Sequence, residues 1–537
     1  MIEGIREIGE NVNNCFLIES RYVKQNKNGW RPFQEELIKV LFEREEKIII
    51  LEAPVGAGKT FIVRQLLERK EFERCPIVMS YPTKILMESQ VGSFKKELGK
   101  EKVTIWPWED FNPNKINIFI YSTDTLVEYI KRKKYQNLED RGELIYRLFT
   151  DLEWFSKYGG IVTSPDVLYL LVQGRYKNSK RILNFLHNSI FIFDEFHCYY
   201  GLKSFIELLE YLLSKIAYKV ILLSATPIKN NDFGKMEKEY GVYNISFSDS
   251  KGGKNDICFN YRLKLSIDSF NFAKAKETEK RLMNLLPLIP KPCAVIFDSI
   301  FRLRHIEKNL KNNGFSDIDF KEWSGMLKEK ELVLNKNTVV LATSAIEVGI
   351  DMKFKSLVFE ASYWPSAIQR LGRVGRKEEG MVIMFTRKDF RPYFKDKTFI
   401  DRDEFEKILR EVLKNPKEET GDGYSFRGQS FNFILKDELL GETFIYNENL
   451  FAMYEIEDWI DDWRSKTLEE KRRILKEFQI NPSKTEDLLL YDRITPFWGV
   501  LKGNLKDDYD YLYKDEIIFP TEDRNELSIK GIVFYGE

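Results

Sequence analysis

Short apolar runs alternate with amphipathic stretches along much of the chain. In the first half, runs typical of strands are found at 47–54, 76–83, 189–197 and 219–227, and helical patterns follow at 60–72, 85–98 and 202–216. Buried strands that alternate with helices are typical of a parallel sheet with crossover helices. The alternation returns at 293–299, 337–344, 356–362 and 380–386. The pattern therefore predicts an α/β protein with two tandem parallel-sheet domains.

The rhythm also suggests where these domains begin and end. Residues 230–257 are polar and glycine-rich and lack a sustained period, so we expect a loop-rich bridge there. This gives a first domain at 1–240 and a second at 241–395. Residues 396–537 lose the alternation and are predicted to form a C-terminal accessory domain of unassigned fold. Residues 104–158 read as an insertion of unassigned function in the first domain.

Composition narrows the classes of protein that fit. No run of eighteen apolar residues and no hydrophobic leader are present, so we expect a cytoplasmic protein without a membrane partner. Lys+Arg and Asp+Glu both number 84, so any nucleic-acid site must be a local groove rather than a product of net charge. The five cysteines form no C-x-x-C pair, which argues against a zinc ribbon or a disulfide framework.

The stretch "APVGAGKT" lies between a predicted strand and a predicted helix, and it matches a phosphate-binding loop except that Ala53 replaces the first glycine. Glycines let the backbone bend so that its N–H groups converge on phosphate oxygens. We expect Lys59 to reach the β- and γ-phosphates and Thr60 to bind Mg²⁺. The predicted nucleotide contacts here are Ala53, Pro54, Val55, Gly56, Ala57, Gly58, Lys59 and Thr60.

The run "SIFIFDEFH" carries two carboxylates to the end of a predicted buried strand. Ligands of open α/β sheets bind at such strand ends. Asp194 is placed to hold Mg²⁺, and Glu195 to polarise an attacking water as general base. The alternative is a structural salt-bridge node.

In the second domain, "QRLGRVGR" spaces Arg370, Arg373 and Arg376 three residues apart, and helical spacing predicts that they share one face. Arginine fingers stabilise the charge that develops on a γ-phosphate, although a surface or nucleic-acid contact is the commoner use of such a set. The turns after two other strands, "SATP" at 224–227 and "ATSAIEVGID" at 342–351, place hydroxyls where they could touch phosphates.

The order of these motifs resembles the superfamily-two helicases with a DExH box. "RPFQ" with Gln34 resembles the adenine-reading Q motif, "YPTK" motif Ia, "TSPD" motif Ib, "VIFDS" motif IV and "QRLGRVGR" motif VI. The resemblance covers about 30–380 and implies two RecA-like domains that hydrolyse ATP with Mg²⁺. It implies nucleotide-site roles for Gln34, Gly349, Asp351, Gln369, Arg373 and Arg376. It implies contacts to single-stranded nucleic acid by Thr83, Thr163, Ser164, Thr343 and Ser344.

Within that superfamily, "FDEFHCYY", "SATP" and "SFRGQS" resemble the helicases of type I CRISPR interference, especially the stand-alone helicase subunit of type I-D-like systems. The resemblance implies a 3′ to 5′ translocase on single-stranded DNA, recruited by a guide-RNA surveillance complex. None of the three histidines is followed by Asp, so if this resemblance holds we expect an HD nuclease to be a separate subunit. We expect a monomer when the protein is free. A DNA-repair or RNA-remodelling helicase and an ATP-gated nucleic-acid clamp without unwinding remain alternatives.

Overall fold

The computed structural model describes most of the two α/β regions. The described ranges are 15–69, 76–122, 159–198, 203–226, 231–312, 315–324, 332–347, 352–394 and 397–413, without residues 107, 113, 175, 271, 273, 274, 299 and 316, and with residues 125, 146, 431–437, 442–448 and 483–484 in addition. The chain divides into two compact units. One is Val23–Ile257, called here the first unit. The second unit comprises the described residues of 15–22 and those from Cys258 onward.

The first unit is built on a parallel sheet with the strand order β10-β3-β9-β8-β4-β7-β6-β5 among the described residues. Its strands are Ile48–Glu52 (β3), Ile77–Ser80 (β4), Val103–Trp106 (β5), Ile116–Tyr121 (β6), Gly159–Thr163 (β7), Ser189–Asp194 (β8), Ala217–Ser224 (β9) and Val242–Ser246 (β10). The central strands are buried along nearly their whole length, as expected of a parallel sheet covered on both faces.

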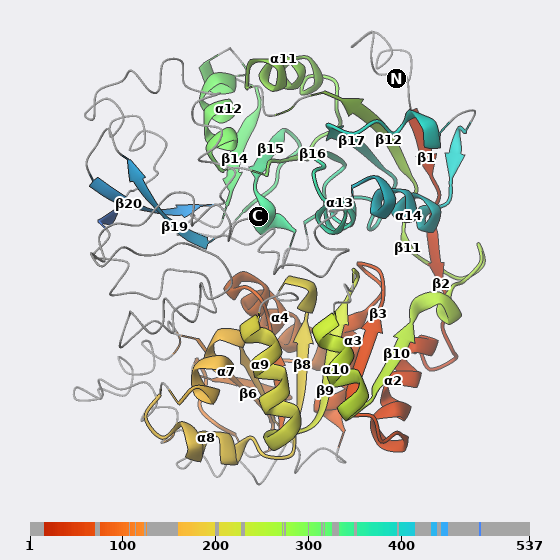
Figure 1. Ribbon diagram of the computed structural model, residues 1–537. Coiled ribbons are helices and arrows are strands. Elements are labelled where there is room, and N and C mark those ends of the chain that lie inside the picture. Colours follow the sequence, from red (N-terminus) through yellow and green to blue (C-terminus); the bar gives the residue numbers. More distant parts are fainter. Residues whose placement is uncertain are drawn as a thin grey trace. The chain divides into compact units, whose positions relative to one another are not determined.

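Helices connect these strands (Figure 1). They are Pro32–Glu43 (α2), Lys59–Glu68 (α3), Lys84–Leu98 (α4), Pro165–Val172 (α7), Ser179–Phe185 (α8), Lys203–Tyr211 (α9) and Asn231–Tyr240 (α10). Helix α7 packs against both α8 and α9, and α2 packs against α3. Proline occupies the first turn of α2 and of α7, where its missing N–H costs no hydrogen bond.

The second unit contains a sheet with the order β14-β15-β13-β16-β17-β12-β1-β18. Its strands are Cys15–Ile18 (β1), Leu263–Ser269 (β12), Cys293–Ile296 (β13), Asp319–Trp323 (β14), Thr338–Ala342 (β15), Ser356–Glu360 (β16), Gly380–Thr386 (β17) and Phe399–Ile400 (β18). Neighbouring strands run parallel except β1 and β12, which are antiparallel. Both sheets therefore confirm the predicted α/β class.

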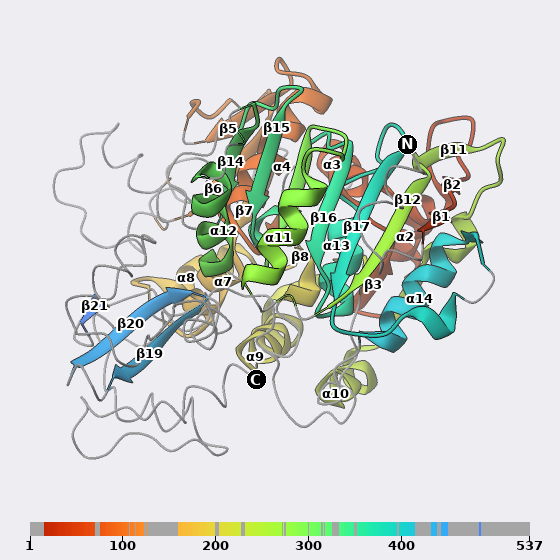
Figure 2. The same cartoon turned by 90° about the horizontal axis from the view of Figure 1, so that it is seen from above.

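The helices of this unit are Ala275–Leu285 (α11), Ile300–Asn312 (α12), Trp364–Leu371 (α13) and Arg402–Val412 (α14). Helix α11 packs beside α12, and α13 packs against α14 (Figure 2). Two short strands, Arg21–Val23 (β2) and Ile257–Asn260 (β11), pair where the chain passes between the units. Further along, Phe431–Asp437 (β19), Glu442–Glu448 (β20) and Ser483–Lys484 (β21) form an antiparallel sheet.

The structure differs from the predicted domain boundaries. The expected loop-rich bridge contains α10 and β10, and β10 pairs with β3, so the first sheet extends past residue 240. Helix α10 was missed because it is short and strongly charged, with only Phe233 and Met236 buried among its apolar side chains.

Other differences lie at the ends of the predicted domains. Strand β1 pairs with β12, so the N-terminal segment belongs to the second unit rather than to a first domain at 1–240. Helix α14 packs on α13, although the accessory domain was predicted to begin at 396. The segment that read as an insertion supplies β6 to the first sheet. The rest of 414–537, apart from the three short strands, lies outside the described residues.

The sequence predicted a protein without a membrane partner, and the helices bear on this prediction. Within the described ranges, none has the length and apolar character needed to cross a bilayer.

Candidate nucleotide site

The phosphate-binding loop begins where β3 ends. Gly56 and Gly58 have φ values of 82° and 89°, a backbone region that favours glycine. Gly58 directly precedes α3, and a Cβ added there would lie 2.6 Å from a guanidinium nitrogen of Arg31. The buried Lys59 ammonium donates to the Ala53 carbonyl at 2.9 Å, while Thr60 is half-buried. The predicted strand, turn and helix are all present.

Helix α2 is joined to the phosphate-binding loop by two side chains. Arg31 directly precedes the helix, and Gln34 lies in its first turn. The Gln34 side-chain oxygen accepts from the Arg31 N–H at 2.9 Å, and its amide nitrogen donates to the Gly58 carbonyl at 3.0 Å. The Arg31 guanidinium donates to the Ala57 carbonyl. Burial lowers the pKa of Arg31. Gln34 was predicted at this site, whereas Arg31 was not.

Asp194 and Glu195 come to the loop because β3, β9 and β8 are neighbours in one parallel sheet. Burial raises the pKa of Asp194 to about 7, with the Glu195 carboxylate adding to the rise and Lys59 opposing it. Glu195 has φ 49°, a conformation that is uncommon outside glycine. The Glu195 N–H donates to the Asp194 carboxylate at 3.0 Å.

His197 links the end of β8 to the end of β9. Its Nδ1 lies 2.9 Å from the Ser224 hydroxyl and 3.4 Å from a Glu195 oxygen. The Ser224 hydroxyl also accepts from the Thr226 N–H at 2.9 Å. Burial lowers the pKa of His197, so the neutral imidazole is favoured.

These donors fit a magnesium ion beside a nucleotide. Mg²⁺ is a hard cation that takes one or two carboxylates together with phosphate oxygens. The Asp194 carboxylate is buried in a site where its pKa is raised, so a cation would favour its ionised form. Glu195 Oε2 is shielded from solvent and lies 3.4 Å from His197 Nδ1, but it makes no hydrogen bond to another described residue. Thr60 stands next to Lys59 at the start of α3.

The arginines of the second unit lie at the end of α13. The helix ends at Leu371 and Gly372 follows as its cap, so Arg370 is helical whereas Arg373 and Arg376 lie beyond the helix. The prediction that all three share one helical face is therefore wrong. Gly375, with φ 70°, turns the chain before Arg376.

Each arginine has a different environment. The Arg370 guanidinium is buried and pairs with Asp298 at 2.7 Å and with Glu347 at 2.6 Å. The Arg373 guanidinium donates to the Glu347 carbonyl. Arg376 is half-buried, and its Nε donates to the Gly372 carbonyl at 2.8 Å. Gln369 is buried on α13, while Gly349 and Asp351 lie outside the described residues.

The residues predicted to contact nucleic acid differ in how much of each side chain is exposed to solvent. Thr83 is exposed at the start of α4, where its hydroxyl accepts from the Leu86 N–H at 3.2 Å. Ser164, Thr343 and Ser344 are half-buried at strand ends. Thr163 differs, because its side chain is 1% exposed and donates to the Tyr121 carbonyl at 3.1 Å. Its hydroxyl is thus part of the sheet and is not available to a strand.

Sequence reasoning missed a set of charges in the second unit: the buried Arg302, Glu347 and Glu360 and the half-buried Asp298. Asp298 and Glu347 lie inside the motifs "VIFDS" and "ATSAIEVGID", but neither carboxylate was predicted to have a role. Glu360 ends the apolar run of β16, the same signal that identified Asp194 at the end of β8. A carboxylate at a buried strand end was therefore the available clue.

Comparisons with known proteins agree with this geometry. Residues 31–233 match the family model described as DEAD/DEAH box helicase. Residues 273–379 match the model for the C-terminal part of the CRISPR-associated nuclease/helicase Cas3. A Methanocaldococcus jannaschii protein that carries the name of the CRISPR-associated nuclease/helicase Cas3 is 25% identical over 373 residues, which are 64% of this chain and 46% of that protein. The chain thus spans about half the length of this curated relative.

Two solved structures share the fold. The DUF1998 helicase MrfA bound to DNA superposes with a TM-score of 0.50 at 18% identity, covering 74% of this chain and 58% of that one. The same helicase bound to DNA and AMPPNP gives 0.50 at 19% identity, covering 73% and 56%. At this identity the likeness shows the fold alone, that of tandem RecA-like domains.

Proposed function

Because the chain joins a DEAD/DEAH box helicase domain to a Cas3-like C-terminal domain, we propose that it is an ATP-dependent helicase. The observation that carries the proposal is that the phosphate-binding loop, at the end of β3, and Asp194 and Glu195, at the end of β8, lie at the same edge of the sheet, with only β9 between the two strands. A lysine, a hydroxyl and two carboxylates at one sheet edge form the donor set that phosphoryl transfer requires.

In this proposal, the residues of the first unit bind the nucleotide and activate water. Residues 53–60 surround the phosphates, with Lys59 on the β- and γ-phosphates and Gln34 on the adenine. Thr60 and Asp194 would hold Mg²⁺, which would neutralise charge on the phosphate oxygens. Glu195 takes the proton of the water whose oxygen attacks the γ-phosphorus as the bond to the β-phosphate oxygen breaks. ATP and water become ADP and phosphate.

The second unit supplies positive charge for the transition state. We propose that Arg373 and Arg376 stabilise the γ-phosphoryl group, with Gln369, Gly349 and Asp351 at the same nucleotide. Hydrolysis would then depend on the units closing on ATP and would release them when the γ-phosphate leaves. Thr83, Ser164, Thr343 and Ser344 are the proposed contacts to the strand backbone.

We further propose that the substrate is single-stranded DNA opened during type I CRISPR interference, with 3′ to 5′ movement. The matched Cas3-like segment and the Methanocaldococcus jannaschii relative support this choice. Guide-RNA pairing would select the target, and a separate HD-nuclease subunit would cut it. A DNA-repair helicase is the second candidate, because MrfA, a helicase solved with DNA, shares the fold.

The test combines two measurements. ATP hydrolysis should rise on addition of single-stranded DNA more than of RNA, and a duplex with a 3′ tail should be unwound whereas one with a 5′ tail should not. Stimulation by RNA alone, or ATP-dependent binding without strand displacement, would contradict the proposal. A pulldown with the surveillance complex separates the CRISPR role, in which the two associate, from repair, in which they do not.

A further inference from the structure

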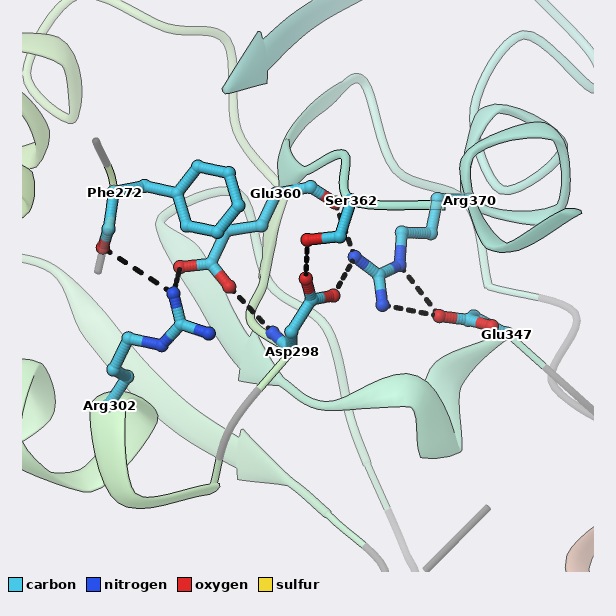
Figure 3. Close-up of polar contacts among 7 residues, drawn as sticks. All are labelled: Phe272, Asp298, Arg302, Glu347, Glu360, Ser362 and Arg370. Carbon is cyan, nitrogen blue, oxygen red and sulfur yellow. Dashed lines mark hydrogen bonds and ion pairs between the residues drawn. The ribbon is translucent and has the colours of Figure 1, made fainter. Parts of the chain in front are cut away.

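A buried ion pair stands beside the arginines of the second unit. Arg302 on α12 and Glu360 at the end of β16 are each 1% exposed, and their charged atoms lie 2.8 Å apart (Figure 3). Neither residue belongs to a helicase motif recognised in the sequence. Desolvation usually cancels most of the energy of such a pair, so stability alone is a poor explanation for it.

Glu360 joins two parts of the unit. One side-chain oxygen pairs with Arg302, and the other accepts from the Asp298 N–H at 2.7 Å. The Glu360 carbonyl accepts from the Arg370 guanidinium. The same residue therefore holds the turn after β13 through its side chain and the end of α13 through its backbone.

Asp298 in turn contacts Arg370. Its carboxylate accepts from Arg370 at 2.7 Å and from the Ser362 hydroxyl at 2.5 Å (Figure 3). Arg370 also pairs with Glu347, whose carbonyl accepts from Arg373. Polar contacts thus run without a break from Arg302 to Arg373.

The charges in this group balance. It contains the guanidinium groups of Arg302, Arg370 and Arg373, and the carboxylates of Asp298, Glu347 and Glu360. A neutral, hydrogen-bonded group of buried charges fixes orientation well, whereas loss of one member leaves a buried charge without its counterion.

We propose that Glu360 is a positioning residue for ATP hydrolysis and that Arg302 is the counterion that neutralises it. Glu360 fixes Asp298 and Arg370, and through them the chain segment that carries Arg373 and Arg376. The inference rests on the proposed function, because it assigns these two arginines to the γ-phosphoryl group. It adds a residue that is buried within the second unit and that acts through Asp298 and Arg370.

The test compares two charge-free double variants of the full chain. Arg302→Met with Glu360→Gln removes both charges but keeps an oxygen that can accept from the Asp298 N–H. Arg302→Met with Glu360→Leu removes that acceptor as well. Both replace the pair with side chains of similar volume, a change that is often neutral for stability.

We expect the Gln variant to keep kcat for ATP within about threefold of wild type, because the restraint on Asp298 remains. The Leu variant should lose at least about tenfold in kcat, since a misplaced catalytic group is costly even over short distances. KM and the Kd of a fluorescent ATP analogue should change by less than about twofold in both, because the phosphate-binding loop is untouched. Melting temperatures should stay within about 4 °C of wild type.

A Leu variant that melts like wild type and keeps wild-type kcat overturns the inference, as does an equal loss in both variants. If the Leu variant does not fold, Glu360→Asp replaces it. This residue keeps the charge but is one methylene shorter, so it cannot reach both Arg302 and Asp298, and it should also lower kcat. Lys59→Ala, measured in parallel, distinguishes failure of the proposed function from failure of the positioning role. Hydrolysis that survives Lys59→Ala overturns the proposed function. Hydrolysis that depends on Lys59 but has the same kcat in the Gln and Leu variants overturns only the positioning role.

Discussion

The two units place carboxylates at the same structural position but surround them differently. In the first unit, Asp194 ends β8 and faces another carboxylate, Glu195, and burial raises the pKa of Asp194 to about 7. In the second unit, Asp298 follows β13 and Glu360 ends β16. Although burial alone would raise it, the guanidinium groups of Arg370 and Arg302 hold the pKa of Asp298 below its usual value.

We relate this difference to the two proposed roles: the carboxylates of the first unit bind a ligand, and those of the second unit hold neighbouring residues in place. Asp194 lacks an arginine partner and its pKa is raised by burial, so it is suited to a ligand that brings positive charge, as Mg²⁺ does. Carboxylates paired with arginines are already neutralised and serve to fix geometry. Substitutions in the first unit should therefore affect chemistry more than folding, and substitutions in the second unit should affect both.

The largest expected effect is that of Lys59→Ala in the first unit. Loss of the ammonium that is proposed to contact the phosphates should lower kcat for ATP by at least about a hundredfold. Phosphate release in the presence of single-stranded DNA measures it. Lys39→Ala is the control, because Lys39 is exposed on α2 and pairs only with Glu43 on the same helix in the described structure. Wild-type turnover in Lys59→Ala would show that the loop does not hold the reacting phosphates.

Glu195→Gln should come next. The amide keeps the shape of the side chain but cannot take a proton from water, so kcat should fall by about a hundredfold or more while nucleotide affinity changes little. Single-turnover hydrolysis and the Kd of a fluorescent nucleotide separate the two quantities. Glu210→Gln, an exposed position on α9, provides the control. A loss of affinity without a loss of rate would assign Glu195 to binding instead of to proton transfer.

In the first unit, the features that could be predicted from the sequence are those that depend on a short stretch of residues. The phosphate-binding loop needs only a strand, two glycines and a helix start in succession, so the local conformation at Gly56, Gly58 and Lys59 could be predicted from the sequence. Asp194 was found because a carboxylate after an apolar run is a local signal as well.

Features that depend on distant parts of the chain could not be predicted. Strand β1 belongs to the second sheet because Cys15 pairs with Ser266, a contact that no short pattern contains. The role of Arg370 depends on Asp298 and Glu347, which reach it from the ends of β13 and β15. Spacing alone suggested one helical face, whereas Gly372 ends the helix before Arg373.

In the second unit, Asp298→Asn should destabilise the fold by about 3 kcal/mol at pH 7, because it leaves the buried Arg370 with one carboxylate fewer. The folded-state pKa of Asp298 lies below its ordinary value of 3.8, so its ionised form stabilises the protein fully above pH 3.8. This stability is lost only as the pH falls through the lower, folded-state pKa. Urea unfolding should therefore show a constant difference from wild type between pH 5 and 8. A difference that shrank within that window would contradict the ion-pair assignment.

The smallest effect, and the one of opposite sign, is expected at Asp166 of the first unit. Burial raises the pKa of this carboxyl to about 7 against the small opposing effect of Ser164, and one of its oxygens makes no hydrogen bond to another described residue. Between pH 3.8 and 7 the folded protein keeps a proton that the unfolded chain has lost, so stability falls as pH rises and levels off above 7.

Asp166→Asn removes that cost of ionisation. The variant should match wild type near pH 4 and exceed it at pH 8 by on the order of 1 kcal/mol, allowing for the partial exposure of the side chain. Urea unfolding at several pH values measures this difference, with Asp249→Asn, an exposed aspartate, as the control. If Asp166→Asn lowered stability at pH 8, as Asp298→Asn should, an unrecognised positive partner would have to neutralise Asp166. The contrast between the units would then be confined to Asp194 and Glu195, where the nucleotide is proposed to bind.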